Sequence, residues 1–416
     1  MPPKHNITTK DSNAAIYIDL AKCIGCNACV RACDKQDVHV YQQNEQKFFP
    51  PIIVGGKLSD SACIGCGQCA VVCPVGAIVP NNEVHKLKEA QIAKKQIVGL
   101  IAPSTRFAFG EAFGLPGDKN CTGGIINILK EKFGFTYIYD VNVGADETTI
   151  IDTEEVLACQ NKPAFTSCCP AWINLMEQEF PNLIPQISTA KSCVEMVGSM
   201  VRKHHPDSYI IELMPCTAKK SERERENTID ACLTAREMIE MFKEAGVKTE
   251  DFNSEAKFDE PYHFCTGGAY IFGTTGGVGE TVLRQIAFLK TGKSTYKLSR
   301  EWEENTLKFK EADFDGQKVV LCVATGGAQI RLAAKLASEG LLKADVVEQM
   351  ACPGGCQNGG GMPKCKDFSI RGKGMFKADI EEPIKAAGEN KTLESHSMNH
   401  EEIHHLFHTK FESRKK

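Results

Sequence analysis

The sequence predicts an α/β protein preceded by a small cysteine-rich domain. At 416 residues the chain is long enough for two or three domains with well-packed cores. Residues 23–73 hold eight of the 20 cysteines, in two copies of one pattern. From residue 97 onward, apolar runs of strand length alternate with amphipathic helical stretches, as in α/β layer folds. We therefore expect a first domain at 1–82, a connecting segment at 83–96 and a main domain at 97–416.

Two cysteine runs, 40 residues apart, share the spacing C-x2-C-x2-C-x3-C. The first run is Cys23, Cys26, Cys29 and Cys33, and the second is Cys63, Cys66, Cys69 and Cys73. Pro74 follows the second run, whereas Asp34 follows the first. Thiolates in this bacterial pattern bind [4Fe–4S] clusters, and the fourth cysteine of each run binds the cluster of the other run. We therefore expect one cubane on Cys23, Cys26, Cys29 and Cys73 and a second on Cys63, Cys66, Cys69 and Cys33, rather than zinc or disulfides.

The remaining chain reads as a polar connector followed by alternating strands and helices. Residues 81–96 are polar and helix-prone, which suits a connecting segment. The predicted strands are 97–104, 135–141, 209–216, 319–327 and 344–352, and the predicted helices are 122–134, 146–159, 234–246 and 328–340. Ligand sites of open α/β sheets lie beyond the carboxyl ends of the strands. Cys216 and Cys352 fall at two such ends, and Cys169 follows the short apolar start of PAFTSCCP.

Composition and charge exclude several classes of protein. Lysine and arginine total 49 against 53 acidic residues, so the net charge of −4 does not favour binding to nucleic acid. No apolar run approaches the length of a membrane span and the first residues lack the apolar core of a signal peptide, so we expect a cytoplasmic protein. Cytoplasmic thiols stay reduced, and 20 cysteines there indicate metal binding or catalysis before disulfides.

Four further cysteines, distant in sequence, lie at sharp turns rich in glycine or proline. They are Cys169 in TSCCPAW, Cys216 in MPCTAKKSE, and Cys352 and Cys356 in EQMACPGGCQNGGGMP. Their spacing alone is a weak signal. The turns, however, would let the backbone approach a bulky ligand, so a third, buried iron–sulfur site is the interpretation that the chemistry favours.

These three motifs, in this order, resemble those of the [FeFe]-hydrogenases, and the double cysteine run resembles their accessory α+β domain of bacterial-ferredoxin type. The resemblance implies an α/β catalytic domain of two lobes, with twisted, mostly parallel sheets flanked by helices. It also implies that Cys169, Cys216, Cys352 and Cys356 hold a [4Fe–4S] cubane. Cys356 would then bridge to a diiron subsite carrying carbon monoxide, cyanide and an azadithiolate, which together form the H-cluster.

The resemblance assigns roles to residues around that cluster. Cys168 would exchange protons with the bridgehead amine, since a thiol can donate and accept a proton. Lys219 would hydrogen-bond one cyanide. The second cyanide would contact Ala102, Pro103 and Ser104, and Met214, Phe272 and Met350 would form an apolar wall. Without the resemblance, Cys168 reads as a further ligand or an inert thiol, and Lys219 as a surface lysine with Glu222 as its solvated neighbour.

A proton path is implied by the same resemblance. Alignment on Gly144-Ala145-Asp146 places the two acidic positions of the path at Asp152 and Glu155, which share one helical face, and its serine at Ser188. Three departures stand out: Asp152 replaces a glutamate, Cys159 stands where the family has an arginine, and Cys193 stands where it has proline. Exposed helix charges are the alternative interpretation of the two acids.

The resemblance thus implies a hydrogenase that couples 2 H⁺ + 2 e⁻ ⇌ H₂ to ferredoxin or flavodoxin and depends on hydrogenase maturation proteins. An iron–sulfur assembly factor and a hydrogen sensor are the alternatives. The C-terminal tail also holds five histidines, His396, His400, His404, His405 and His408. Their spacing favours a solvated helix over a metal site.

Overall fold

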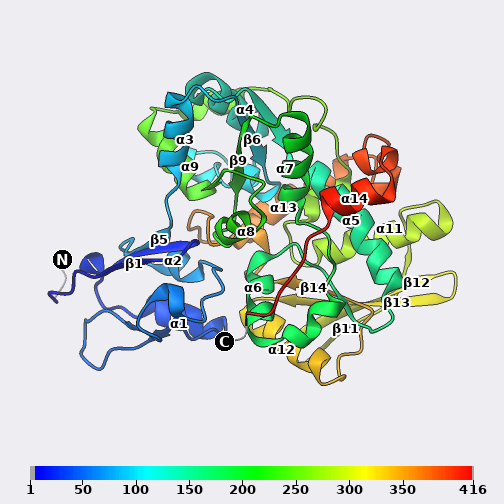
Figure 1. Ribbon diagram of the computed structural model, residues 1–416, viewed down its shortest axis with the longest axis horizontal. Coiled ribbons are helices and arrows are strands. Elements are labelled where there is room, and N and C mark those ends of the chain that lie inside the picture. Colours follow the sequence, from blue (N-terminus) through cyan, green and yellow to red (C-terminus); the bar gives the residue numbers. More distant parts are fainter. Residues whose placement is uncertain (1–4, 415–416) are drawn as a thin grey trace.

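The computed structural model describes residues 5–414, which form a small cysteine-rich domain and a larger two-lobed domain (Figure 1). The small domain (blue) packs beside both lobes. Each lobe is built on its own β-sheet with helices around it. Among the described residues, no helix combines the length and the apolar character that a membrane span needs.

The small domain is an α+β unit in which a helix follows each cysteine loop. Its antiparallel sheet has the order β1-β2-β5, and a two-stranded ribbon pairs β3 with β4. The elements are β1 (Lys10–Ser12), β2 (Ile16–Asp19), α1 (Ala28–Lys35), β3 (Tyr41–Gln42), β4 (Ile52–Ile53), α2 (Gln68–Val72) and β5 (Ile78–Pro80). The helices carry the last two cysteines of the first run and the third cysteine of the second, so the thiols lie at the loop–helix junctions.

The first lobe is a four-stranded parallel sheet of order β10-β9-β6-β7. Its strands are β6 (Ile97–Ile101), β7 (Tyr137–Asp140), β9 (Tyr209–Met214) and β10 (Ala231–Thr234). One face is covered by α3 (Val84–Ile92), α4 (Thr122–Phe133) and α9 (Ala235–Glu244). The other face is covered by α5 (Val141–Ala158) and α7 (Cys193–His204). The predicted strands at 97–104, 135–141 and 209–216 are confirmed, and the polar connector contributes α3 to this lobe.

The second lobe is a mixed five-stranded sheet of order β11-β12-β13-β14-β8. Its strands are β8 (Ala164–Phe165), β11 (Lys297–Glu304), β12 (Leu307–Phe314), β13 (Gln317–Thr325) and β14 (Val346–Met350). The pairs of β13, β14 and β8 are parallel, whereas β11, β12 and β13 are antiparallel. The strands predicted at 319–327 and 344–352 are confirmed. The hairpin of β11 and β12 was not predicted, because β11 is almost wholly exposed and shows no apolar alternation.

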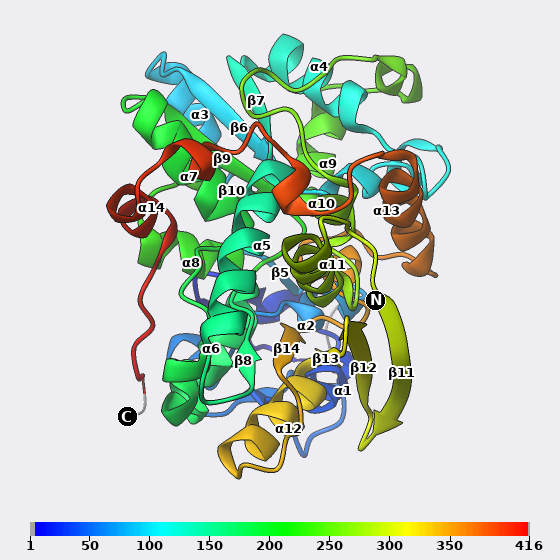
Figure 2. The ribbon, with the colours of Figure 1, turned by 90° about the vertical axis from the view of Figure 1, so that its right-hand side faces the viewer.

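The remaining helices pack around the second lobe and between the lobes. They are α6 (Pro170–Glu179), α8 (Lys219–Glu226), α10 (Gly267–Ile271), α11 (Gly277–Thr291), α12 (Gly327–Ser338), α13 (Ser369–Glu381) and α14 (His400–Phe407). Helix α5 joins the lobes, since it packs on α7 of the first and on α11 of the second (Figure 2). It begins at residue 141, five residues before the predicted start, because the side chain of Asp140 caps it by accepting a hydrogen bond from the amide of Asn142.

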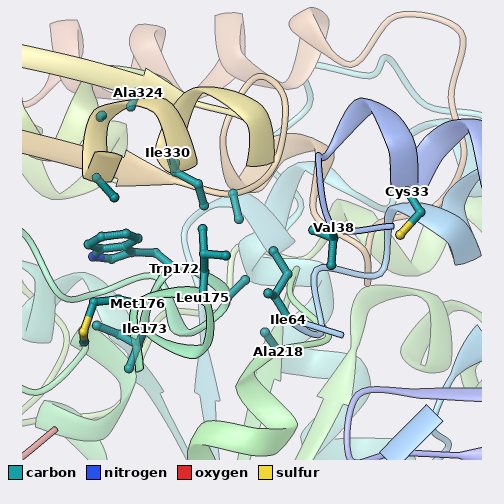
Figure 3. Close-up of a cluster of buried hydrophobic side chains, with 14 of the residues drawn as sticks. Cys33, Val38, Ile64, Trp172, Ile173, Leu175, Met176, Ala218, Ala324 and Ile330 are labelled. Carbon is teal, nitrogen blue, oxygen red and sulfur yellow. The ribbon is translucent and has the colours of Figure 1, made fainter. Parts of the chain in front are cut away.

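The small domain and the second lobe share one apolar core. Ile64 of the small domain lies against Ala218 and Leu175, and the cluster continues to Trp172 and Ile330 (Figure 3). All five side chains are at most 1% exposed. A core that crosses the boundary fixes the orientation of the small domain on the larger one.

Candidate metal centre

A cavity lies between the lobes, where parallel strands of both sheets end. Ala102 follows β6, Met214 ends β9, Met350 ends β14, and Cys168 lies three residues after β8. This is the edge at which α/β sheets form their ligand sites. The sequence-based expectation of a site at these strand ends therefore agrees with the geometry.

The four cysteines distant in sequence meet at this cavity. Cys169, Cys216, Cys352 and Cys356 all line it, and Cys66 of the small domain joins them. Burial raises the pKa of Cys216, of Cys352 and of Cys356, for which it reaches about 12. Thiolates in such apolar surroundings need positive charge close by, which bound iron supplies. The donor set thus fits a [4Fe–4S] cluster, and the assignment of these ligands stays a prediction.

Lys219 points its ammonium group into the same cavity. Its Nζ donates to Ser192 Oγ at 2.6 Å and to the carboxylate of Glu222. Burial opposes the charge of the ammonium group, but Glu222 outweighs it, so the pKa of Lys219 is raised. The interpretation of Lys219 as a surface lysine with a solvated Glu222 is therefore wrong, because both side chains are buried and paired.

The other predicted cofactor contacts line the cavity as well. The apolar ones are Met214, Phe272 and Met350, beside the short segment Ala102, Pro103 and Ser104. Ser104 is 1% exposed, and its Oγ has no hydrogen-bond partner within the described part of the chain. An unpartnered buried hydroxyl in an apolar wall fits a ligand that accepts a hydrogen bond there, as cyanide does.

Two thiols that were not predicted as ligands, Cys168 and Cys193, also face the cavity. They pack together against Phe272 and Met350. Burial raises the pKa of Cys168 well above its usual range, and it raises that of Cys193 to about 12. Burial therefore favours the protonated form of both thiols. Cys193 stands at the family's proline position, so this chain has a second thiol beside the first.

The predicted proton-path residues do not line the cavity, but Asp152 is close enough for its charge to raise the pKa of Cys168. Asp152 is fully buried, and burial raises its pKa to about 7, with Ser188 lowering it and Glu155 raising it. No hydrogen bond of normal geometry joins Asp152 to a described residue. Glu155, one helical turn further, is partly exposed and accepts a hydrogen bond from the Thr189 amide at 2.8 Å. Asp152 is thus not an exposed helix charge, and the structure brings the three residues together without testing their role.

Sequence reasoning missed two residues at the outer end of this path. Thr189 Oγ1 lies 2.5 Å from Glu155 Oε1 and 2.6 Å from His408 Nδ1. Cys159, at the position to which the resemblance assigns an arginine, donates to the carbonyl of Asn161. The only sequence signal for this contact was the histidine-rich tail, which was interpreted as a solvated helix. Within residues 5–414, no three His, Cys, Asp or Glu side chains are grouped to hold a single metal ion.

The small domain groups its cysteines in the crossed arrangement that was expected. A largely apolar cavity is lined by Cys23, Cys26, Cys29 and Cys73, three thiols of the first run and the fourth of the second. The amide of Gly25 donates to Cys23 Sγ at 3.4 Å. Hydrogen bonds from backbone amides to sulfur tune the potential of iron–sulfur clusters.

The second set is Cys33, Cys63, Cys66 and Cys69, whose charges act on one another. The amide of Val40 donates to Cys33 Sγ at 3.2 Å, and the hydroxyl of Tyr41 donates to Cys69 Sγ at 3.6 Å. Burial raises the pKa of Cys33 to about 11. The C-x2-C-x2-C-x3-C spacing of the two runs is what favours a metal cluster at this set. The ligand assignment stays a prediction here too.

The second set touches the large cavity directly. Cys352 Sγ lies 4.0 Å from the carbonyl oxygen of Cys66. A Cβ added to Gly360 would stand 2.5 Å from that oxygen and 2.7 Å from the Cα of Gly67, so only glycine allows the two backbones to meet. Hydrogen bonds hold the contact on either side. Thr217 Oγ1 donates to the carbonyl of Gly65 at 2.7 Å, and Gln68 Nε2 donates to the carbonyl of Asn358 at 2.9 Å.

Comparisons with known proteins agree with this architecture. The pattern of the family described as iron only hydrogenase large subunit, C-terminal domain, matches residues 95–360, and that of the 4Fe-4S dicluster domain matches residues 16–79. The chain is 35% identical to the periplasmic [Fe] hydrogenase large subunit of Nitratidesulfovibrio vulgaris, over 84% of this chain and 86% of that protein. It is 31% identical to the NADP-reducing hydrogenase subunit HndD of Solidesulfovibrio fructosivorans, over 92% and 71%.

Structural similarity points the same way. A variant of [FeFe]-hydrogenase HydA1 from Chlamydomonas reinhardtii superposes with a TM-score of 0.69 and 25% identity, over 80% of this chain and 99% of that one. Similarity extends to cytosolic iron-sulfur assembly component 3 of Mus musculus, at 26% identity over 75% and 73% of the two chains.

The fold and the site together define an iron–sulfur protein of two lobes with a dicluster domain. The chain belongs to the iron-only, or [FeFe], hydrogenase family.

Proposed function

We propose that the chain is an active hydrogenase that interconverts H₂ with protons and electrons at an H-cluster in the large cavity. One observation carries the proposal: a single apolar cavity gathers four cysteines, the thiol of Cys168 and the ammonium of Lys219. Cys169, Cys216, Cys352 and Cys356 would hold the cubane, and Cys356 would also reach the diiron unit. When bound, the H-cluster supplies the iron site for H₂ and an amine that exchanges protons.

The protein residues around the cavity orient the cofactor and exclude water. Lys219, fixed by Ser192 and Glu222, keeps one N–H free for an anionic ligand. Ser104 offers a hydroxyl that has no hydrogen-bond partner among residues 5–414. Met214, Phe272 and Met350, all at most 6% exposed, keep the remaining wall dry.

Protons would reach the cavity through Cys168. Its thiol stays protonated because burial raises its pKa, so it can donate a proton and recover it from the side facing Asp152. Asp152 suits that exchange because a pKa of about 7 keeps both of its protonation states populated near neutral pH. Ser188 and Glu155 would continue the path outward. Because the side chain of Asp152 is shorter than that of a glutamate, a water molecule would bridge the remaining gap in the path.

Electrons would pass through two [4Fe–4S] clusters in the small domain. Cys26 is exposed, so the first cluster would lie close to the surface where a carrier docks. Cys66 would place the second cluster beside the Cys352 end of the H-cluster. We predict ferredoxin or flavodoxin as the carrier, hydrogenase maturation proteins as the source of the cofactor, and a cytoplasmic location.

Turnover of the matured protein tests the proposal. We expect H₂ production from reduced methyl viologen and H₂ uptake with the oxidised dye, about 14 iron atoms per chain, and infrared bands of bound carbon monoxide and cyanide. Cys168→Ala should keep the bands and the iron while kcat collapses. Absence of the infrared bands from a matured sample would refute the proposal.

An iron–sulfur assembly factor is the alternative that the Mus musculus relative supports. Identity to the two hydrogenases, 31% and 35%, exceeds the 26% to that relative. A protein of the assembly class would show three cubanes but no carbon monoxide bands. A hydrogen sensor would show the bands, with wild-type rates already as low as those of Cys168→Ala.

A further inference from the structure

The chain segment after α14 lies against the outer end of the predicted proton path. It forms an antiparallel bridge in which Ala190 pairs with His408. The amide of Thr409 donates to the carbonyl of Thr189 at 2.8 Å, and the amide of Lys191 donates to the carbonyl of Phe407 at 2.8 Å. Phe407 is fully buried. The backbone therefore fixes the position of the His408 side chain, and Figure 2 shows this segment (red) leaving α14 beside α7 and running past α8.

His408 is joined to Glu155 through one hydroxyl group. Thr189 Oγ1 lies 2.6 Å from His408 Nδ1 and 2.5 Å from Glu155 Oε1, and the imidazole and the carboxylate are 3.6 Å apart directly. The His408 side chain is 18% exposed. Its ring stacks on that of His404, an exposed residue, with centroids 5.1 Å apart. An imidazole that touches both solvent and the path can exchange protons with each of them.

We propose that His408 exchanges protons with solvent at the outer end of the path and passes them to Glu155 through the hydroxyl of Thr189. This inference rests on the proposed function, because it concerns the supply of protons to Cys168. It gives this chain an outer group of its own, since Cys159 replaces the arginine of the family and makes no contact with the Glu155 carboxylate among the interactions of the described residues.

The transfer balances without any further reactant. Protonated His408 donates its Nδ1 proton to Thr189 Oγ1 while the Thr189 hydroxyl gives its own proton to Glu155. Neutral imidazole, an intact hydroxyl and a protonated carboxyl group remain, and His408 recovers a proton from water. The reverse sequence releases protons during H₂ oxidation. Both directions need only the two hydrogen bonds that the hydroxyl already makes.

Burial and the charges around His408 set the pKa of its imidazole. Burial lowers the pKa of His408 below its usual 6.5, Glu155 raises it, and His404, His400 and Lys191 lower it. Below that pKa the imidazole is charged and can deliver protons, and above it the neutral ring can accept them. Removing the imidazole should therefore lower the rate of H₂ production most at acid pH.

His408→Gln tests the proposal, because glutamine keeps polar atoms near Thr189 but its amide neither takes up nor releases a proton near neutral pH. We expect H₂ production to fall about tenfold, less than the ~10²–10⁴-fold of a group in contact with the reaction, since water partly replaces an outer relay. The acid limb of the pH profile should disappear, and added imidazole should restore the rate. His405→Gln, an exposed histidine on α14, is the matched control and should retain the wild-type profile.

Two further measurements separate a relay from a structural role. Thr189→Val should reproduce the loss, whereas Thr189→Ser, which keeps the hydroxyl, should not. In histidine-labelled full-length protein, NMR should show that Glu155→Gln lowers the pKa of His408, a readout that needs no turnover. Equal rates in His408→Gln and His405→Gln, or no imidazole rescue, would overturn the proposal. If wild-type protein makes no H₂ but the NMR coupling is present, the proposed function fails and the His408–Glu155 link stands.

Discussion

Asp152 allows the sharpest prediction, because its carboxyl group is buried without a hydrogen bond of normal geometry among the described residues. Burial raises its pKa from 3.8 to about 7. Between these two values the folded state binds more protons than the unfolded state, so stability falls as the pH rises and the loss is complete above about 7. At 1.36 kcal/mol per pH unit, the raised pKa of Asp152 lowers the free energy of unfolding by about 2 kcal/mol at pH 5.5 and by about 4 kcal/mol at pH 8.

Asp152→Asn removes this cost, because an amide does not ionise. At about 2 °C per kcal/mol for a long chain, the melting temperature should rise by about 4 °C at pH 5.5 and about 8 °C at pH 8. The same substitution should slow H₂ turnover, since an amide neither takes up nor releases a proton near neutral pH. Anaerobic thermal melts of the cluster-loaded protein measure the first effect and dye-linked H₂ assays measure the second.

Glu154→Gln is the matched control, because Glu154 is an exposed neighbour on the same helix. It should change neither the melting temperature nor the turnover rate appreciably. A gain in melting temperature for Asp152→Asn that is equal at both pH values would show that Asp152 is not held protonated near neutrality. Unchanged turnover would remove Asp152 from the proton path.

Three further predictions concern the cavity and the domain contact. Gly360→Ala places a Cβ 2.5 Å from the carbonyl oxygen of Cys66, so it should slow H₂ production driven by reduced ferredoxin while infrared spectra still show a loaded cofactor. Leu175→Ala empties part of the shared core and should lower the free energy of unfolding by about 2–5 kcal/mol, measured by thermal or denaturant unfolding. Ser104→Ala should change stability by less than about 0.5 kcal/mol, since its hydroxyl has no partner among the described residues, but shift a cyanide infrared band.

The sequence predicted the parts of the fold whose local pattern is strong. Buried parallel strands such as β6 are continuous apolar runs, and the cysteine runs have a spacing that few other sites use. The hairpin of β11 and β12 escaped prediction because one strand is exposed on nearly every residue. The edge strand β11 is therefore set by pairing with β12 rather than by its own pattern.

Site residues, too, could be predicted where the local sequence pattern is strong and were missed where it is weak. Residues in dense motifs, such as Cys169 and Lys219, could be placed at the cavity from the sequence with the help of family resemblance. The burial of Glu222 could not, because a KKSERERE helix reads as solvated until the tertiary fold covers it. His408 was missed for another reason: its partner Thr189 is 219 residues away, and no local spacing records a contact of that range.

The apolar core shared by the small domain and the second lobe limits how this protein can be dissected. Cutting the chain within residues 83–96 and expressing residues 97–416 alone would expose Leu175 and Ala218, which lie against Ile64 of the small domain, to water. Such a fragment should aggregate unless those positions receive polar side chains. Shortened catalysts based on this chain would need a redesigned surface at these positions.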